Sequence, residues 1–496
     1  MTIKLSTPEN ESAGAFAGLG RYVPLAAWLI VVITLAIIPF KIHQTGYVPG
    51  GDARRHVAKA FSDKTNQEIL VLVPDYKVDN SVGWESFLRY LREKLGWNAD
   101  ALISFSLIGL MLCIFYAPLP WLRRPEAWMA ALLAQLVAIP ELMVRLTQAR
   151  PLLLTAAVLV AVLVAWAKPD AKGPSWLKLL LTTFGFALSA WMHGQWYLWV
   201  LPLAAFFLAR AWSAAISLTL CWMAGTILGA LLTGKPFDFV AQTIMLIRRV
   251  SGEHIPKWML VGELQPSYGE YTTMVLIAIV FLWRKIESKN NFAVFQSPAF
   301  WLVVIGWILG LGADRCWADW GVPAVLVWLA MQFDELMTGA WEASSPKRIL
   351  ACGLLALPLL IHATNDLDRR YSRGQEEVFL DAADPALQGW LPDHGGILYS
   401  SQMGIFYNTF YKNPTANWRY VLGIEPALMP DDDLKIYRDI QRFPGAVQAY
   451  EPWIDKMRPA DRLAIYGGSQ PNLPRLEWHH AGGGIWLGRL PREKSK

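Results

Sequence analysis

Residues 22–40 read YVPLAAWLIVVITLAIIPF, an uncharged apolar run long enough to cross a bilayer as a helix. No small-x-small cleavage pattern follows it, so we expect an uncleaved anchor rather than a signal peptide. Comparable apolar runs recur near residues 100–120, 126–143, 151–167, 176–192, 195–210, 213–233, 271–284, 298–313, 320–334 and 349–364. The sequence therefore predicts a polytopic α-helical membrane protein with about eleven transmembrane helices.

The composition agrees with this fold class. Of the 496 residues, 54% are hydrophobic and 17% are charged, whereas soluble domains carry roughly 25% charged residues. The net charge of +5 is too small to indicate a nucleic-acid partner. The four cysteines show no spacing typical of a metal site or a disulfide framework.

The distribution of basic residues predicts the orientation. With the N-terminus in the cytoplasm, each short inward loop is basic; these loops carry Arg123, Arg124, Lys168, Lys172, Lys178, Arg210, Arg284, Lys285, Lys289, Lys347 and Arg348. We therefore expect a multi-pass protein of the inner (cytoplasmic) membrane. An odd number of spans places the C-terminus on the periplasmic or extracytoplasmic side.

Two segments are expected outside the membrane. Residues 42–99 form the first external loop, with juxtamembrane helices expected over 53–61 and 84–97 and a strand over 69–73. After residue 368 charged residues, Pro and Gly return, which predicts strands at 397–401, 463–466 and 484–487 and a helix near 433–443. The expected domains are a transmembrane domain, 1–368, and a small soluble α/β domain, 369–496.

The first external loop contains GGDARRH at residues 50–56. Two glycines permit a sharp turn, and Asp52 either caps the following helix or serves as a general base or metal ligand. Arg54, Arg55 and His56 suit a phosphate group, with anionic lipid headgroups as the alternative.

Further ionisable residues fall on the same predicted face of the membrane. Arg150 and Arg315 are candidates for phosphate binding, although a local ion pair with Asp319 is the simpler interpretation for Arg315. Glu141 and Arg145 have the i, i+4 spacing of an intrahelical ion pair. The loop at 234–270 is long enough to close over a substrate. The other site candidates are Arg54, His56, Asp79, Glu141, Arg145, His193, Asp319 and His254.

The charged residues outside the inward loops gather at this outer face, with few at mid-membrane depth. This distribution favours a site at the membrane surface over a transport path.

The stretch DARRHVA at 52–58 resembles the Asp-Glu-x-Arg-Tyr-Ala motif of the lipid A aminoarabinose transferases and the related opening of the protein O-mannosyltransferases. Both belong to the GT-C superfamily of membrane glycosyltransferases, which the predicted spans, the long first external loop, the acidic residue after the first span and the exported C-terminal domain together resemble. The resemblance in layout covers most of residues 20–365, and the C-terminal domain itself resembles no named family. Asp52 matches the acidic residue, Arg55 the arginine and His56 the aromatic residue. Ala53 replaces the second acidic residue of the motif.

The resemblance implies a glycosyltransferase of the cell envelope that moves a sugar from a polyprenyl-phosphate-linked donor to a hydroxyl of a lipid, glycan or protein acceptor. The implied reaction is an inverting displacement, with Asp52 as the base and Arg55, Arg150 or Arg315 on the lipid phosphate. A divalent cation, Mg²⁺ or Mn²⁺, is left open as a cofactor, although one carboxylate makes a poor site for it. Two other functions stay open: a flippase or transporter of a lipid-linked saccharide, and a non-catalytic scaffold for envelope assembly.

Overall fold

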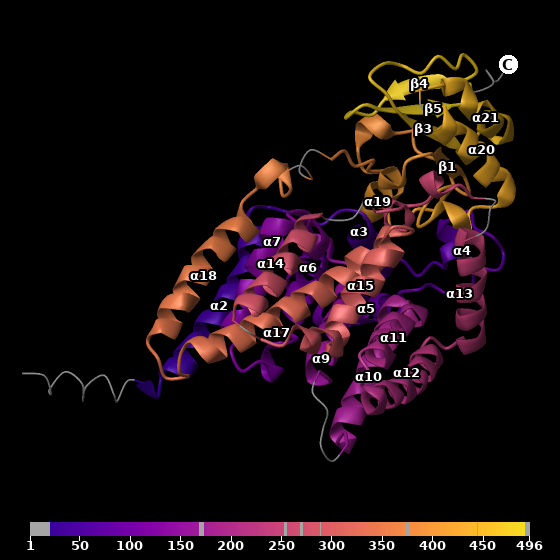
Figure 1. The fold of residues 1–496 in the computed structure, drawn as a ribbon. Coiled ribbons are helices and arrows are strands. Elements are labelled where there is room, and N and C mark those ends of the chain that lie inside the picture. Colours follow the sequence, from indigo (N-terminus) through magenta and orange to yellow (C-terminus); the bar gives the residue numbers. More distant parts are fainter. Residues whose placement is uncertain are drawn as a thin grey trace, which may run out of the picture.

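The computed structural model describes residues 20–167, 173–251, 255–267, 271–287, 289–372, 374, 377–443 and 445–491. Helices form an elongated region, and a small sheet lies at one end of it (Figure 1). Within the described residues four helices are long and apolar enough to cross a membrane: α2 (Val23–Gln44), α6 (Ala99–Tyr116), α12 (Trp212–Leu232) and α18 (Lys347–Thr364). These helices support the prediction that the chain is a membrane protein.

The predicted count of eleven spans is not confirmed, although each predicted range contains a helix. The pair α7 (Glu126–Ala138) and α8 (Glu141–Thr147) passes the same test only as one span bent by 114°. With 14 residues, α9 (Leu152–Ala165) reaches about 21 Å, less than a bilayer core of about 30 Å. The remaining apolar ranges hold α10 (Trp176–His193), α11 (Val200–Leu208), α14 (Tyr271–Ile286), α15 (Pro298–Gly310) and α17 (Val322–Ala340).

Short helical turns connect these elements. They are η1 (Leu119–Trp121), η2 (Trp196–Trp199), η3 (Lys257–Met259), η4 (Gly262–Leu264), η5 (Asn291–Gln296), α16 (Asp314–Cys316), the π-helical η6 (Trp317–Gly321), η7 (Leu367–Arg369), η9 (Pro385–Leu387), η10 (Pro426–Leu428) and η11 (Val447–Tyr450).

Glycines let α10 and α12 pack closely. A Cβ added at Gly225 would lie 2.6 Å from the Cβ of Phe186, and one at Gly229 would lie 2.7 Å from the carbonyl oxygen of Ala187. Glycines four residues apart are typical of close contacts between membrane helices, where no side chain separates the backbones. A larger residue at either position would force the two helices apart.

The C-terminal region forms a mixed five-stranded sheet of order β2-β1-β3-β5-β4. Its strands are β1 (Ile397–Ser400), β2 (Arg419–Tyr420), β3 (Arg462–Tyr466), β4 (Glu477–His480) and β5 (Ile485–Arg489). β1 is parallel to β2 and β3, whereas β5 is antiparallel to β3 and β4. The three predicted strands and the predicted helix, now α20 (Asp431–Arg442), are confirmed.

Alternate residues of β3 face two different cores, as the two-residue period of a strand requires. Leu463 and Ile465 pack with residues of α20 and α21 (Glu451–Lys456), whereas Ala464 packs with Phe406 of α19 (Met403–Lys412). The core on the α19 side also contains residues of the first loop, which lies between α2 and α6, among them Ala58, Ile69 and Leu70. The C-terminal sheet and the first loop therefore share one core.

The first loop contains α3 (Asp52–Ala60), α4 (Asn66–Ile69) and α5 (Val82–Leu95), so the two predicted helices are confirmed. The strand predicted over 69–73 is wrong. A capping box between Thr65 and Glu68 favours a helical turn instead, and only Leu70 forms a β-bridge, to Tyr420.

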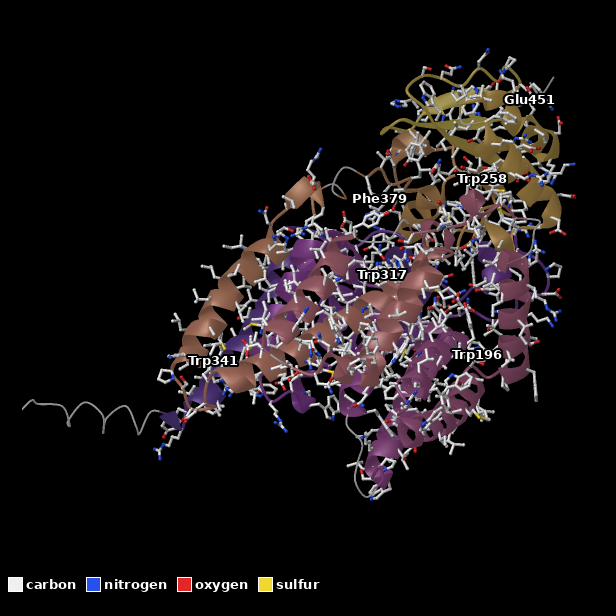
Figure 2. The ribbon with its side chains drawn as sticks, viewed as in Figure 1. Trp196, Trp258, Trp317, Trp341, Phe379 and Glu451 are labelled. Carbon is white, nitrogen blue, oxygen red and sulfur yellow. The ribbon has the colours of Figure 1, made fainter. Side chains whose placement is uncertain are left out.

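Labelled aromatic residues mark the two ends of the helical region (Figure 2). Trp258 and Phe379 lie where this region meets the C-terminal sheet, whereas Trp341 lies at the opposite end. The candidate site lies at the end next to the sheet.

Candidate functional site

The turn before α3 sets the position of Asp52. Gly51 is the N-cap residue, with a φ of 59° that side-chain-bearing residues rarely adopt. The helix begins at Asp52, and no side chain caps it, so the capping interpretation of Asp52 is wrong. Its Oδ1 instead lies 3.1 Å from Nε of Arg55, and its Oδ2 lies 3.7 Å from Nε of Arg150.

The charged residues of α3 point into the protein. Arg54, Arg55 and His56 are 1%, 5% and 1% exposed. Arg55 lies 3.1 Å from Asp79 and 3.3 Å from Glu85, and His56 Nδ1 lies 3.3 Å from Oε1 of Glu85. Burial of this kind leaves almost no surface for lipid headgroups, which argues against that alternative.

Arg54 takes a different direction from Arg55. It pairs with Glu377, donates to Asn408, and its guanidinium lies 4.8 Å from the ring centre of Phe379. All three partners come from the C-terminal part of the chain. Arg54 therefore joins α3 to that region and does not line the site described below.

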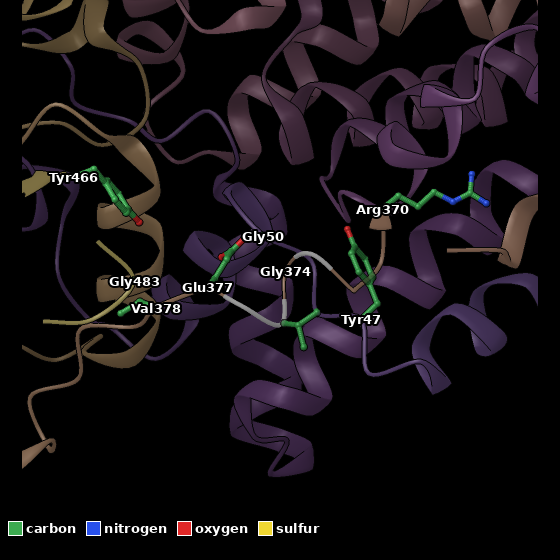
Figure 3. Close-up of a pocket in the computed structure, with 9 residues that line it drawn as sticks. Tyr47, Gly50, Arg370, Gly374, Glu377, Val378, Tyr466 and Gly483 are labelled. Atoms are coloured by element: carbon green, nitrogen blue, oxygen red, sulfur yellow. The ribbon is translucent and has the colours of Figure 1, made fainter. Parts of the chain in front are cut away.

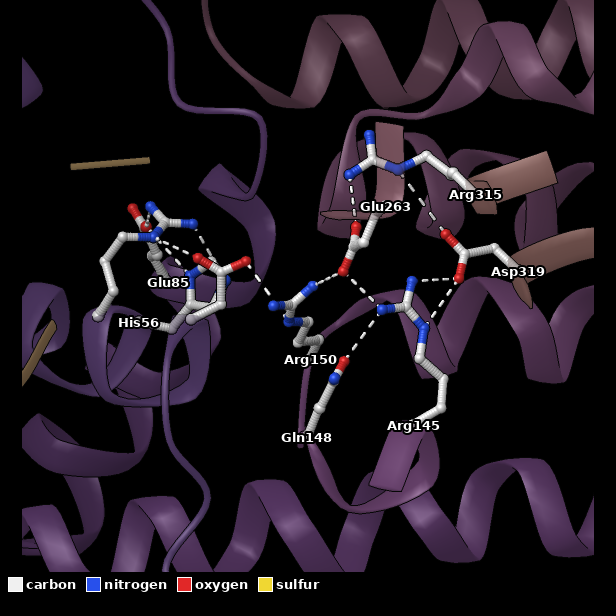
Figure 4. Close-up of polar contacts among 10 residues, drawn as sticks. His56, Glu85, Arg145, Gln148, Arg150, Glu263, Arg315 and Asp319 are labelled. Carbon is white, nitrogen blue, oxygen red and sulfur yellow. Dashed lines mark hydrogen bonds and ion pairs between the residues drawn. The ribbon is translucent and has the colours of Figure 1, made fainter. Parts of the chain in front are cut away.

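A second cluster centres on Glu263 of η4 (Figure 4). Its carboxylate lies 2.5 Å from Arg145 Nη1 and 2.7 Å from Arg315 Nη2, and it also pairs with Arg150. Asp319 pairs with Arg145 as well. Three guanidinium groups from separate segments thus converge on one carboxylate.

Two local ion pairs were expected in this region. The pair between Glu141 and Arg145 is not formed, because Glu141 is exposed and Arg145 is engaged by tertiary partners. The pair between Arg315 and Asp319 is present at 3.8 Å, but Arg315 is closer to Glu263.

The two clusters meet at a cavity of about 320 Å³. Its polar wall includes Asp52, Arg55, His56, Arg150, His193, Glu263, Arg315, Tyr407 and Glu425. Its apolar wall includes Leu198, Leu246, Ile247, Val250, Val261, Leu264, Ile424 and Leu428. The cavity therefore combines a charged side with a side that suits hydrocarbon.

Three of the eight apolar residues, Leu246, Ile247 and Val250, come from α13 (Pro236–Ser251), within the segment predicted to be a long loop. That segment is helical over its first part, and it also supplies Glu263. Closure of this segment over a substrate stays a prediction.

The carboxylates in the cavity differ in their proton affinity. Burial raises the pKa of Asp52, but Arg55 and Arg150 outweigh it and lower the pKa to about 2. Burial also acts to raise the pKa of Glu263, but the surrounding arginines outweigh burial, and this pKa is lowered. For Glu425 burial prevails and raises the pKa to about 7, with Arg315 offsetting only part of it.

The remaining predicted residues have varied positions. Asp79 and Asp319 are buried behind the wall, where they bind Arg55 and Arg145 respectively. His193 lines the cavity, and His254 lies outside the described residues.

Three residues of the cavity were missed by the sequence analysis: Glu263, Tyr407 and Glu425. Glu263 belongs to the segment 234–270. An acidic residue in this segment, on the same predicted face as the candidate arginines, could have indicated an ion pair with them. Tyr407 and Glu425 lie in the C-terminal region, where neither motif nor spacing marks them.

Among the described residues no group of three or more His, Cys, Asp and Glu side chains is arranged to hold a metal ion. Three carboxylates of the first loop, Asp52, Asp79 and Glu85, each face a guanidinium or imidazole group instead. We therefore assign no residues to Mg²⁺ or Mn²⁺.

A more open cavity of about 440 Å³ lies beside the same turn (Figure 3). It is lined by Tyr47, Val48, Gly50, Arg370, Gly374, Glu377, Val378, Tyr466 and Gly483. One of its two charged residues, Glu377, is paired with Arg54. The smaller cavity, with its three arginines, is the better candidate for a site that binds an anion.

No protein-family model and no curated protein sequence matches this chain.

Proposed function

We propose that this protein is a membrane glycosyltransferase that uses a polyprenyl-phosphate-linked sugar as donor. The observation that carries the proposal is the convergence of Arg145, Arg150 and Arg315 on a single carboxylate at the cavity wall. Guanidinium groups bind phosphate through parallel hydrogen bonds, with the same forked geometry that they use for carboxylates.

The donor phosphate would take the place of the Glu263 carboxylate. Arg150 and Arg315 line the cavity, so both can reach a bound phosphate, and Arg55 faces it from α3. Leu246, Ile247 and Val250 of α13 would contact the first isoprene units. The cavity thus places charged and apolar side chains next to each other, which matches a donor whose phosphate is attached to a hydrocarbon chain.

The reaction is a displacement at the anomeric carbon of the sugar. The acceptor oxygen forms a bond to that carbon, and the bond from carbon to phosphate oxygen breaks with its electron pair. The arginines stabilise the negative charge that develops on the departing phosphate, a contribution often worth about 10² to 10³ in rate. Asp52, ionised at neutral pH, is the base implied by the resemblance.

The proposed setting is the inner membrane, with the N-terminus in the cytoplasm and the C-terminal region on the periplasmic side. The acceptor would be a lipid, glycan or protein of the cell envelope. The basic inward loops of the sequence support this orientation, and the site lies at the end of the helices next to the sheet.

The test uses the full chain in proteoliposomes with a panel of labelled polyprenyl-phosphate sugars and an envelope extract as acceptor. Release of free polyprenyl phosphate and transfer of label are both measured. Arg315→Gln should lower transfer by about 10² to 10³-fold. Arg438→Gln, on a side chain of α20 that is 40% exposed, should leave it unchanged.

Two outcomes would overturn the proposal: no transfer by the wild-type protein with any donor, or wild-type transfer by Arg315→Gln. Movement of the labelled donor across the bilayer without transfer would instead support a flippase. If neither activity is found and the C-terminal region captures an envelope component, the scaffold is supported.

A further inference from the structure

Glu425 is the one carboxylate of the cavity contributed by the C-terminal sheet region. It precedes η10 and lines the cavity together with Asp52, Arg150 and Arg315. Its Oε1 atom, however, is buried and has no hydrogen-bond partner among the described residues.

A buried oxygen without a partner costs free energy, and such atoms are uncommon in folded proteins. Glu425 nevertheless lines the cavity, so its carboxylate is placed to receive a hydroxyl group of a molecule bound there.

The charged and titratable groups around Glu425 do not cancel the negative charge of its carboxylate. They are Arg315 and Glu263 on the helical side, and Tyr407 and Tyr437 on the C-terminal side. Arg315 donates to Glu263, 2.7 Å away, so its charge is already shared.

Asp52 is in the opposite situation. Two guanidinium groups hold it, Arg55 at 3.1 Å and Arg150 at 3.7 Å. The two guanidinium groups stabilise the ionised form of Asp52. The carboxylate therefore binds a proton weakly and is a weak base.

On the basis of the glycosyl transfer proposed above, we infer that Glu425, rather than Asp52, is the general base that takes the proton of the acceptor hydroxyl. Its pKa of about 7 agrees with this role, since a base acts best when its pKa lies near the working pH. Asp52 is then a positioning residue that holds Arg55 and Arg150 toward the cavity.

The step balances as follows. The acceptor O–H proton moves to the Glu425 carboxylate while the acceptor oxygen bonds to the anomeric carbon. The bond between that carbon and the phosphate oxygen breaks, and its electron pair leaves with the lipid phosphate. The proton passes from Glu425 to solvent after the products leave.

The experiment compares the wild-type protein, Glu425→Gln, Glu425→Asp and Asp52→Asn in proteoliposomes from pH 5 to pH 9. It measures the maximal transfer rate and, separately, binding of the donor. Glu425→Gln should lower the maximal rate by about 10² to 10⁴-fold, with donor binding unchanged, and should remove the rise in rate near pH 7. Glu425→Asp should restore part of the rate. Asp52→Asn should weaken donor binding and keep the rise.

Glu451→Gln, on a side chain that is 41% exposed, is the matched control and should behave as the wild type. Thermal unfolding of each variant shows whether it is folded. The inference is overturned if Glu425→Gln keeps the rate and the pH profile, or if Asp52→Asn alone removes the rise. Absence of transfer in the wild type itself would overturn the proposed function instead, so the two failures are distinguished.

Discussion

Two buried groups of charges lie at different places in the helical region, and they use the same residue types differently. Glu126 and Arg348 form a closed pair between α7 and α18, with Nε to Oε1 at 2.7 Å and Nη2 to Oε2 at 3.0 Å. Both side chains are buried, and neither lines a cavity described above. Glu263, in contrast, is shared by three arginines at a cavity wall.

The difference shows how a structural ion pair is distinguished from a site. In the closed pair, both oxygens of Glu126 accept from Arg348, and the remaining Nη1 of Arg348 donates to the carbonyl oxygen of Ala343, so a ligand would gain nothing. In the Glu263 cluster, three arginines share the carboxylates of Glu263 and Asp319, and two of these arginines line a cavity. An incoming anion can therefore compete for the arginines.

The largest expected effect tests the closed pair. Arg348→Met should lower the free energy of unfolding by about 3 to 5 kcal/mol, because it leaves Glu126 charged and buried without a partner. Thermal and denaturant unfolding in detergent measure it. The double variant Glu126→Met with Arg348→Met should recover most of the loss. A loss below 1 kcal/mol for the single variant would contradict the prediction, because a loss of that size is typical of an ion pair on the surface.

The next prediction concerns Asp52 at the edge of the cavity. Its pKa is lowered to about 2, so its ion pairs stabilise the folded state above the usual carboxyl pKa and lose this effect as the pH falls toward 2. The free energy of unfolding of the wild type should exceed that of Asp52→Asn by about 2 kcal/mol at pH 6. The difference should shrink between pH 4 and pH 2. Chemical unfolding of both proteins measures it, and a difference independent of pH would contradict it.

The smallest effect tests whether Glu263 occupies the position of a phosphate. Glu263→Gln should tighten binding of a polyprenyl phosphate about tenfold, which corresponds to about 1.4 kcal/mol, because the ligand no longer competes with a carboxylate. Titration in detergent micelles measures it. Glu477→Gln, on a side chain that is 47% exposed in the sheet, is the control. Weaker binding by Glu263→Gln would mean that Glu263 contacts the ligand instead of giving way to it.

Much of the fold could be predicted from local patterns. Apolar runs predicted the positions of the helices, and short runs of strand-forming residues predicted β1, β3 and β5, because both signals depend on nearby residues. The number of spans was harder, since α9 and α15 are apolar but short. Whether such helices cross a membrane depends on neighbours that the local pattern does not contain.

The site was predicted only in part, for a related reason. Arg145 has an acidic residue at helical spacing, yet it pairs with Glu263 and Asp319, which are 118 and 174 residues away in the chain. Glu85 lies among the polar positions of an amphipathic helix, but α3 covers it and Arg55 and His56 bind it. Tertiary partners decided both cases, and spacing in one sequence does not reveal them.

The long separation of the contacts of Arg54 has a consequence for the assembly of the protein. Its partners Glu377 and Asn408 follow it by 323 and 354 residues. At a synthesis rate of about 5 to 20 residues per second, they emerge tens of seconds after α3. During that interval α3 carries a cation whose partners have not been made. The newly made chain therefore waits with an open first loop until the C-terminal region has been synthesised.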